Sequence, residues 1–198
     1  MFTGIIEVTG LITDVLDFDT TRRFSIDVPQ LADELRPGDS VAVDGACLTV
    51  IERRSQGFTA DVIGTTLDRT IAGEYTDGSC VNLERSLKVG HRFDGHMVQG
   101  HIDGIGKVVR CIMDGEFWMM DFSLPVEVAA LTIERGSLAV NGVSLTVSEL
   151  IDEDTCRIGV IPYTYEHTNL GNLETGDSVN IEGDLIGKYV GRVLTARS

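Results

Sequence analysis

Proline and basic side chains are scarce in this chain of 198 residues. It contains 4 prolines beside 22 glycines, and 16 lysines and arginines beside 31 acidic residues, which gives a net charge of −15. Many glycines with few prolines favour tight turns between strands over a helical bundle. Because a negatively charged chain repels phosphate backbones and anionic lipid surfaces, we expect no nucleic-acid partner and no membrane partner.

Closely spaced cysteines and long apolar runs are also lacking. The 4 cysteines form no C-x-x-C pair, which argues against a structural zinc site and favours reduced thiols in the cytoplasm. No stretch approaches the roughly 20 apolar residues of a membrane span, and residues 1–10 contain no basic or apolar leader. Hydrophobic residues make up 42% of the chain, enough for one large or two small domains. We therefore expect a soluble, unexported protein.

The sequence contains an internal repeat with a period of about 97 residues. Residues 1–10 align with residues 97–106 without a gap. The segment SVAVDGACLTV at 40–50 matches SLAVNGVSLTV at 137–147, and VNLE at 81–84 matches VNIE at 179–182. This period is too long for a solenoid or propeller unit. The chain therefore predicts the duplication of one small domain.

Each copy is predicted to be a small closed β-barrel. Asp44-Gly45 and Asn141-Gly142 lie between Val-rich segments and are typical of two-residue type I′ hairpin turns. Several short strands in each copy favour closure, since a closed barrel leaves no unpaired edge. Residues 29–36 and 125–135 are predicted to be short helices, because each segment opens with a proline.

The carboxyl end departs from the duplication. We expect domains at 1–96 and 97–185, followed by a helix at 186–198. Its apolar residues recur at the i, i+3, i+4, i+7, i+8 spacing of an amphipathic helix: Ile186, Tyr189, Val190, Val193 and Leu194. The pattern leaves two partners open for this apolar stripe, namely the helix's own barrel or copies of the helix from other subunits.

Positions at which the copies differ are candidates for separate chemical roles. His101 stands where the first copy has Ile5, and Cys47 stands where the second has Ser144. Histidine exchanges protons near neutral pH, so His101 is a candidate for proton transfer, although lone histidines are also common on surfaces and in cores. Cys47 follows the hairpin turn, where a thiol is either a packed apolar group or a nucleophile. Ser40 has no neighbouring histidine that would mark a catalytic triad, and a serine before a strand is typical of a solvated turn.

No metal site is predicted from the histidines. His91, His96 and His101 recur every five residues, which places successive side chains on opposite faces of a strand. The spacing also misses the i, i+4 pattern of helical zinc ligands.

Several motifs in one order resemble the riboflavin synthase family over nearly the whole chain. They are the opening MFTGIIE at 1–7, the two paired segments at 40–50 and 137–147, GHMVQGHIDG at 95–104 and IPYT at 161–164. The resemblance implies two lumazine-binding six-stranded Greek-key barrels and a carboxyl-terminal helix that drives homotrimer formation.

The family's enzymes convert two molecules of 6,7-dimethyl-8-ribityllumazine into riboflavin and 5-amino-6-ribitylaminouracil, without cofactor or metal. By resemblance, the active site forms between the first barrel of one subunit and the second barrel of a neighbour. Lumazine synthase is considered as a further protein partner.

The resemblance also implies roles for single residues. His101 is the candidate for proton transfer, with Thr146 nearby, and Ser40 or Cys47 is the nucleophile or orients a nucleophilic water. Asp184 matches an acidic position of the family and is expected to assist by hydrogen bonding. A reaction between two identical substrates needs two similar pockets that face each other, and a duplicated chain provides them. Stacking the two substrates in these pockets supplies much of the rate enhancement by proximity.

The resemblance implies two groups of ligand-contacting residues, one for each barrel. For the first barrel they are Gly4, Ile5, Ile6, Cys47, Leu48, Thr49, Asp61, Val62, Ile63, Gly64, Thr65 and Thr66. For the second barrel they are Gly100, His101, Ile102, Arg135, Ser144, Leu145, Thr146, Gly159, Val160, Ile161, Pro162, Tyr163 and Thr164. Backbone groups here are expected to bind the pyrimidine edge of the lumazine, and hydroxyls its ribityl chain.

The chain departs from the family at three of its positions. Family members often have Glu where this chain has Thr65, often Lys where it has Arg135 and usually Leu where it has Tyr165. We therefore expect changes in one polyol contact and in the shape of the second pocket. The rival interpretation is a lumazine protein, which binds a lumazine or flavin without turning it over. Ser40, Cys47 and His101 together favour the enzyme.

Overall fold

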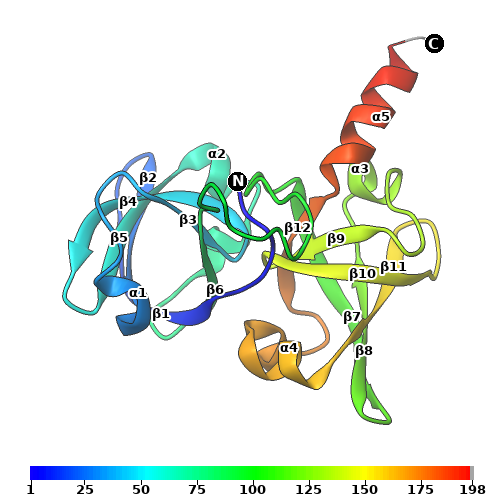
Figure 1. Ribbon diagram of the computed structural model, residues 1–198, viewed down its shortest axis with the longest axis horizontal. Helices are drawn as coiled ribbons and strands as arrows, with labels where there is room; N and C mark the ends of the chain where they lie inside the picture. Colours follow the sequence, from blue (N-terminus) through cyan, green and yellow to red (C-terminus); the bar gives the residue numbers. More distant parts are fainter. Residues whose placement is uncertain (197–198) are drawn as a thin grey trace.

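The computed structural model describes residues 1–196 and contains two closed antiparallel barrels side by side (Figure 1). The strands of the first barrel are β1 Val8–Asp17, β2 Thr21–Asp27, β3 Ser40–Val43, β4 Ala46–Arg54, β5 Gly57–Ile63 and β6 Cys80–Arg85. Those of the second are β7 Gly104–Asp114, β8 Phe117–Ser123, β9 Ser137–Val140, β10 Val143–Leu150, β11 Thr155–Val160 and β12 Ser178–Gly183. The order β1-β2-β5-β4-β3-β6 recurs as β7-β8-β11-β10-β9-β12. The predicted fold class is therefore confirmed.

The two predicted hairpins are present. Asp44 and Gly45 connect β3 to β4 with φ angles of 44° and 80°, and Asn141 and Gly142 connect β9 to β10 with 45° and 78°. Two successive positive φ values are those of a type I′ turn, whose twist matches the twist of the paired strands. In each hairpin the second residue after the turn, Cys47 or Ser144, lies on the outer surface of its barrel.

The helices are short except at the carboxyl end. They are α1 Pro29–Ala32, α2 Gly64–Leu67, α3 Val126–Ala129, α4 Pro162–His167 and α5 Leu185–Thr195, with 3₁₀ turns η1 Ile71–Glu74 and η2 Asn169–Asn172. The predictions of helix over 29–36 and 125–135 were therefore too long. In the first segment Pro37 restricts the preceding residue, and Gly38 at φ +93° turns the chain into β3. In the second, Arg135 makes the corresponding turn at φ +63°.

Each barrel has its own apolar core. Alternate residues of the strands point inward, and the largest fully buried side chains include Phe24 and Phe58 in the first barrel and Phe122 and Ile158 in the second. Because the inward residues fill the barrels, ligands have to bind on the outer faces or at the rims.

The leading segments of the two halves are exchanged between the barrels (Figure 1). The backbone of Phe2 pairs with that of Val98 between the barrels, where the N–H of Phe2 donates to the Val98 carbonyl at 2.7 Å. Ile6, from the first half, packs against the core of the second barrel, and Ile102, from the second half, packs against the core of the first. Each half therefore supplies part of the other barrel's surface.

Buried asparagines and one aspartate join the two hairpins. The Nδ2 of Asn82 donates to the Asn141 carbonyl at 2.9 Å, and the Nδ2 of Asn180 donates to the Asp44 carbonyl at 2.8 Å. This reciprocal pair follows the duplication and fixes the barrels relative to one another. Asn169 adds a hydrogen bond from its Nδ2 to the Asp44 carboxylate at 2.8 Å.

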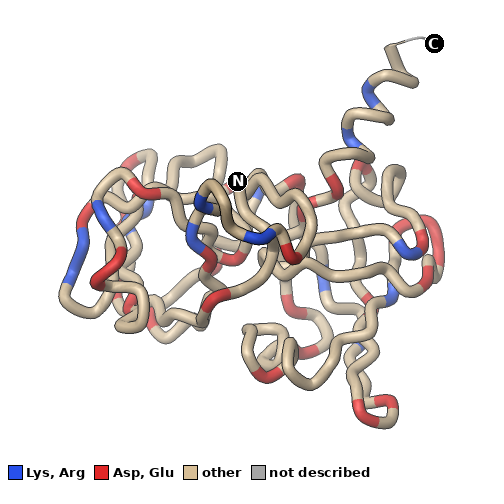
Figure 2. The backbone as a smooth tube through the Cα atoms, viewed as in Figure 1, with Lys and Arg blue, Asp and Glu red and all other residues tan. Residues whose placement is uncertain are grey.

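Helix α5 extends away from the second barrel (Figure 1). Near its base the backbone of Gly187 and Gly191 approaches Leu131, whereas Ile186 and Tyr189 are 65% and 67% exposed. Within residues 1–196 no helix has the length and apolarity needed to cross a membrane. Acidic and basic residues are interspersed over both barrels, but the charged side chains of α5 are all basic (Figure 2).

Candidate functional site

A cavity of about 370 Å³ on the first barrel gathers six of the predicted site residues. It is lined by Ala46, Cys47, Thr65, Thr66, Arg69, Thr70, Gly100, His101 and Ile102. The thiol of Cys47 and the exposed imidazole of His101 thus share one space, although they are distant in sequence. The cavity combines a thiol, an imidazole and hydroxyls, which are the kinds of group that acid–base and addition chemistry on a small polar ligand requires.

Gly100 allows this approach. The N–H of Cys47 donates to the Gly100 carbonyl at 2.9 Å, and a Cβ on Gly100 would lie 2.6 Å from the Cβ of Cys47. With φ at +81°, only glycine fits this position without strain. Gly4 repeats the arrangement against Ser144, with a hydrogen bond of 2.7 Å and φ of +76°.

These contacts correct the expected grouping of ligand segments. Gly100–Ile102 lines the cavity of the first barrel, not the second, and the segment from Gly4 to Ile6 lies against Ser144 on the second barrel, not the first. The physical reason is the Phe2–Val98 crossing, which carries each leading segment onto the opposite barrel. The duplication reveals matched segments, but it does not say on which barrel each one packs.

Two buried glutamates hold the exchanged segments in place. Glu84 accepts from the N–H groups of Thr3 and Gly4 at 2.7 and 2.9 Å, and Glu182 accepts from those of Gln99 and Gly100 at 2.7 and 3.0 Å. Burial raises the pKa of both carboxyl groups, and the backbone donors oppose that rise. We call these two residues glutamate clamps, because each carboxylate fixes the backbone of one exchanged segment.

The second barrel presents a related but different surface. Ser144 and Thr164 correspond to Cys47 and Thr66, whereas Ile5 takes the place of His101. Tyr163 stands at the position of Thr65 and stacks on the ring of His167 at 4.1 Å. The second surface is thus more aromatic and lacks a titratable group at the His101 position.

Tyr165, one of the three departures from the family pattern, packs inside this region. Its ring stacks on Trp118 with centroids 3.8 Å apart and planes within 4°. An aromatic pair therefore lies beside the core of the second barrel.

The other predicted hydroxyls lie along the same outer faces. Ser40 is opposite Thr49 and Ala42 is opposite Cys47 in the β3–β4 ladder, so all four residues share one face. Ser40 is two residues from Ala42, roughly 7 Å along the strand, and does not line the cavity. In the second barrel Thr146 is opposite Ser137 and repeats this arrangement.

Several predicted ligand contacts can be made only by the main chain. The side chains of Leu48, Val62, Leu145 and Val160 are buried in the barrel cores. By contrast, Ile63 and Ile161 are 56% and 59% exposed where they precede α2 and α4, respectively. Gly64, Gly159 and Pro162 have no polar side chain to offer a ligand.

The carboxylates of Asp61 and Asp184 have partners within the fold, whereas Arg135 is exposed. Asp61 accepts from the Nε and Nη2 of Arg23 at 2.6 and 2.8 Å, and this hydrogen-bonded ion pair lowers its pKa. Asp184 caps α5 by accepting from the N–H of Ile186 at 2.9 Å. Arg135 is exposed at the turn before β9, where its N–H donates to the Val147 carbonyl at 2.8 Å. The hydrogen bond shown for the Asp184 side chain is therefore to the helix backbone.

Sequence reasoning missed three residues of these surfaces. Arg69 and Thr70 line the first cavity, and Thr70 recurs as Thr168 in the second half, which is a signal that could have been used. His96 was considered only as a metal ligand, but its Nδ1 lies 2.7 Å from the Oγ of Ser144. No group of three or more His, Cys, Asp or Glu side chains in residues 1–196 is arranged to hold a metal ion.

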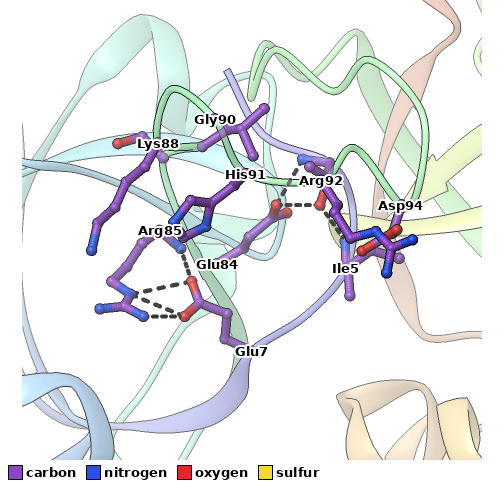
Figure 3. A pocket seen from close by; sticks show the side chains of 12 residues that line it. Ile5, Glu7, Glu84, Arg85, Lys88, Gly90, His91, Arg92 and Asp94 are labelled. Carbon is purple, nitrogen blue, oxygen red and sulfur yellow. Dashed lines mark hydrogen bonds and ion pairs between the residues drawn. The ribbon is translucent and has the colours of Figure 1, made fainter.

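A larger cavity of about 550 Å³ lies under the segment that joins the barrels (Figure 3). Arg85 lines this cavity and binds Glu7, with an Nη2–Oε2 distance of 2.6 Å. Glu84 lies next to it and accepts from the N–H of Thr3. Lys88 and Arg92 come from the joining segment above. Anions and cations are mixed throughout this cavity, so its charge does not select one kind of ion.

Comparison with known proteins agrees with the duplicated architecture. The family described as "Lumazine binding domain" matches residues 3–86 and again residues 99–184. Solved structures of LumP are similar: the complex with riboflavin has a TM-score of 0.86 at 26% identity, covering 92% of this chain and 99% of that one. The complex with 6,7-dimethyl-8-(1'-D-ribityl) lumazine has a TM-score of 0.84, with the same identity and coverage.

Curated relatives are more similar in sequence. The riboflavin synthase of Mycobacterium bovis is 43% identical over 199 residues, covering 98% of each chain. That of Bacillus subtilis is 39% identical over 194 residues, covering 98% of this chain and 90% of the relative. That of Schizosaccharomyces pombe is 36% identical over 200 residues, covering 99% and 95%. The duplicated barrels and this similarity over nearly the full length show that the chain belongs to the riboflavin synthase family.

Proposed function

We propose that this chain converts two molecules of 6,7-dimethyl-8-ribityllumazine into riboflavin and 5-amino-6-ribitylaminouracil. The observation that carries the proposal is the pair of related outer surfaces, of which only one holds the Cys47 and His101 side chains together. A reaction between two copies of one substrate requires two similar binding surfaces with different chemistry. The relatives of known name point to the same reaction.

The residues of the first cavity supply the proton transfer and the nucleophile. A base removes a proton from the 7-methyl group of the donor lumazine, and a nucleophile adds at C7 of the acceptor. We assign the proton transfer to His101, which lines this cavity. Cys47 shares its cavity and Ser40 lies farther along the same face, so Cys47 is the nearer nucleophile or water-orienting group. Thr146 occupies the matching face of the second barrel.

The substrates have to be brought face to face, which we assign to neighbouring subunits. In this arrangement the first barrel of one subunit meets the second barrel of the next. Holding both lumazines in contact makes the transfer effectively unimolecular. This lowers the activation free energy of the reaction by several kcal/mol. Gly4, Gly100 and their glutamate clamps support this role because they fix both surfaces in advance.

A turnover assay tests the proposed reaction. Purified protein supplied only with the dimethyl lumazine is expected to produce riboflavin, followed by its absorbance and by chromatography of both products in equal amounts. The similarity to LumP defines the alternative, in which the chain binds the lumazine and leaves it unchanged. Tight fluorescent binding without riboflavin formation would establish that alternative.

Helix α5 is assigned to assembly of a homotrimer. The apolar side chains of Ile186, Tyr189, Val190 and Val193 are at least half exposed, and such a stripe is stabilised by burial against other copies. The alternative of packing on its own barrel is disfavoured, because none of the described residues of α5 is buried. The four free thiols support a cytoplasmic location, and an association with lumazine synthase rests on the family resemblance.

Removing α5 after Lys188 is expected to change the assembly from trimer to monomer. The truncated chain loses most of the apolar stripe, while the barrels keep their cores. Sedimentation velocity of both proteins gives the answer. Deletion of residues 197–198 alone is the matched control and is expected to leave trimers intact. Trimers that survive the longer deletion would contradict this role of the helix.

A further inference from the structure

His96 and Ser144 form a hydrogen-bonded pair on the second barrel. The Nδ1 of His96 lies 2.7 Å from the Oγ of Ser144, and the imidazole is 9% exposed. The backbone N–H of His96 donates to the Thr3 carbonyl at 3.1 Å, so the backbone of His96 is anchored to the same exchanged segment that brings Gly4 onto Ser144. A short side-chain contact, fixed backbone and burial together define a rigid pair.

The surroundings of the ring determine which nitrogen carries the proton. Burial lowers the pKa of His96, while the charge of Asp184 acts in the opposite direction, so the neutral imidazole is favoured. Within the described residues the buried Nε2 has no hydrogen-bond partner. A buried N–H without an acceptor is less favourable than an unpartnered lone pair. The proton therefore belongs on Nδ1, from which it is donated to the Ser144 oxygen.

This direction of donation frees the proton of Ser144. With its oxygen accepting from His96, the serine hydroxyl donates to an acceptor outside the pair. Ser144 corresponds to Cys47, which lines the cavity of the first barrel, so that outside position is the second binding surface. The two surfaces thus each have a histidine: His101 lies inside the first cavity, and His96 lies behind the serine of the second.

We propose that His96 is a positioning residue that presents the Ser144 hydroxyl as a hydrogen-bond donor to a ring nitrogen or carbonyl oxygen of the pteridine bound at the second barrel. The inference rests on the proposed function for the identity of the ligand. It assigns the pair to ligand binding at one of two surfaces and leaves proton transfer to His101.

A double-mutant cycle tests this assignment. Riboflavin and the dimethyl lumazine are titrated into the full-length protein, and Kd, KM and kcat are measured. Ser144→Ala and His96→Leu are each expected to weaken one class of sites about fivefold, the effect of one hydrogen bond. The double variant is expected to bind no more weakly than either single variant.

Two further variants separate positioning from structural support. His96→Asn places an amide nitrogen near the position of Nδ1 and is expected to restore most of the affinity that His96→Leu loses. On a Cys47→Ala background, the matched position of the first barrel, His96→Leu is expected to keep its full fivefold effect. Urea unfolding of each variant checks that the barrels remain folded.

The outcomes are distinguishable from failure of the proposed reaction. Additive losses in the double variant, or unchanged affinity in His96→Leu, overturn the positioning role. A wild-type protein that binds the lumazine without turnover overturns the proposed reaction, and the binding cycle still decides the role of His96. A wild-type protein that binds neither ligand overturns both.

Discussion

Replacing His101 by glutamine is expected to lower kcat by roughly 10²-fold or more, the usual range for loss of a general acid or base. Glutamine keeps the polarity and approximate size of the side chain but does not exchange protons near neutral pH. The backbone anchors are unaffected, since the N–H of His101 donates to Glu182 at 3.2 Å and Gly100 still contacts Cys47. Ligand affinity is therefore expected to stay within about threefold.

The duplication supplies the matched control for this variant. Ile5 occupies the position of His101 in the other half, and Ile5→Gln introduces the same side chain on the second surface. Because no proton-transfer group is removed there, kcat is expected to fall far less than in His101→Gln. Single-turnover kinetics with saturating lumazine compare the two. Equal kcat in wild type and His101→Gln would remove His101 from the proton transfer.

The second large effect is expected in the stability of the protein as the pH changes. Asp44 is 1% exposed at the contact of the two hairpins, and burial raises the pKa of its carboxyl group from 3.8 to about 7. It accepts hydrogen bonds from the Asn82 N–H and the Tyr75 hydroxyl, each at 2.7 Å, which offset part of that rise. The described contacts of this carboxylate include no cation.

The direction in which pH changes the stability follows from proton binding to Asp44. Between pH 4 and pH 7 the folded protein holds the Asp44 proton more tightly than the unfolded chain, so its contribution is largest in acid and is lost as the pH rises. A pKa change of this size corresponds to about 4 kcal/mol of unfolding free energy. Asparagine resembles the neutral acid, because its oxygen accepts from Asn82 while its nitrogen donates to the Tyr75 oxygen.

Asp44→Asn is therefore expected to match wild type near pH 4 and to be more stable by up to about 4 kcal/mol near pH 8. Urea unfolding at fixed protein concentration across this range measures the difference, in which contributions from other groups cancel. The reciprocal variant is Asn141→Asp, which adds a second buried carboxylate and is expected to lose stability as the pH rises. Parallel curves for Asp44→Asn and wild type would show that Asp44 does not titrate in this way.

The turn positions, the strand alternation and the terminal helix followed from local rules. Asp44-Gly45 and Asn141-Gly142 adopt the predicted type I′ turns because few residue pairs accept two successive positive φ values. Strand alternation then places Cys47 and Ser144 outward, and the helical spacing of Ile186 to Val193 produces α5. The segments 29–36 and 125–135 were overestimated because tertiary turns into β3 and β9 end these helices early.

The sequence by itself determined the duplication, the paired hairpins, the terminal helix and the chemical types at the site, since these depend on contacts between near neighbours or on matching residues. Only the tertiary structure decided that Gly100–Ile102 lies on the first barrel and Gly4 on the second, and that His96 reaches Ser144. The same holds for Asp44, whose buried carboxylate meets donors from Asn82 and Asn169. The physical reason is that two similar barrels offer equivalent local partners to each leading segment, and packing of the whole chain around Phe2 and Val98 selects between them.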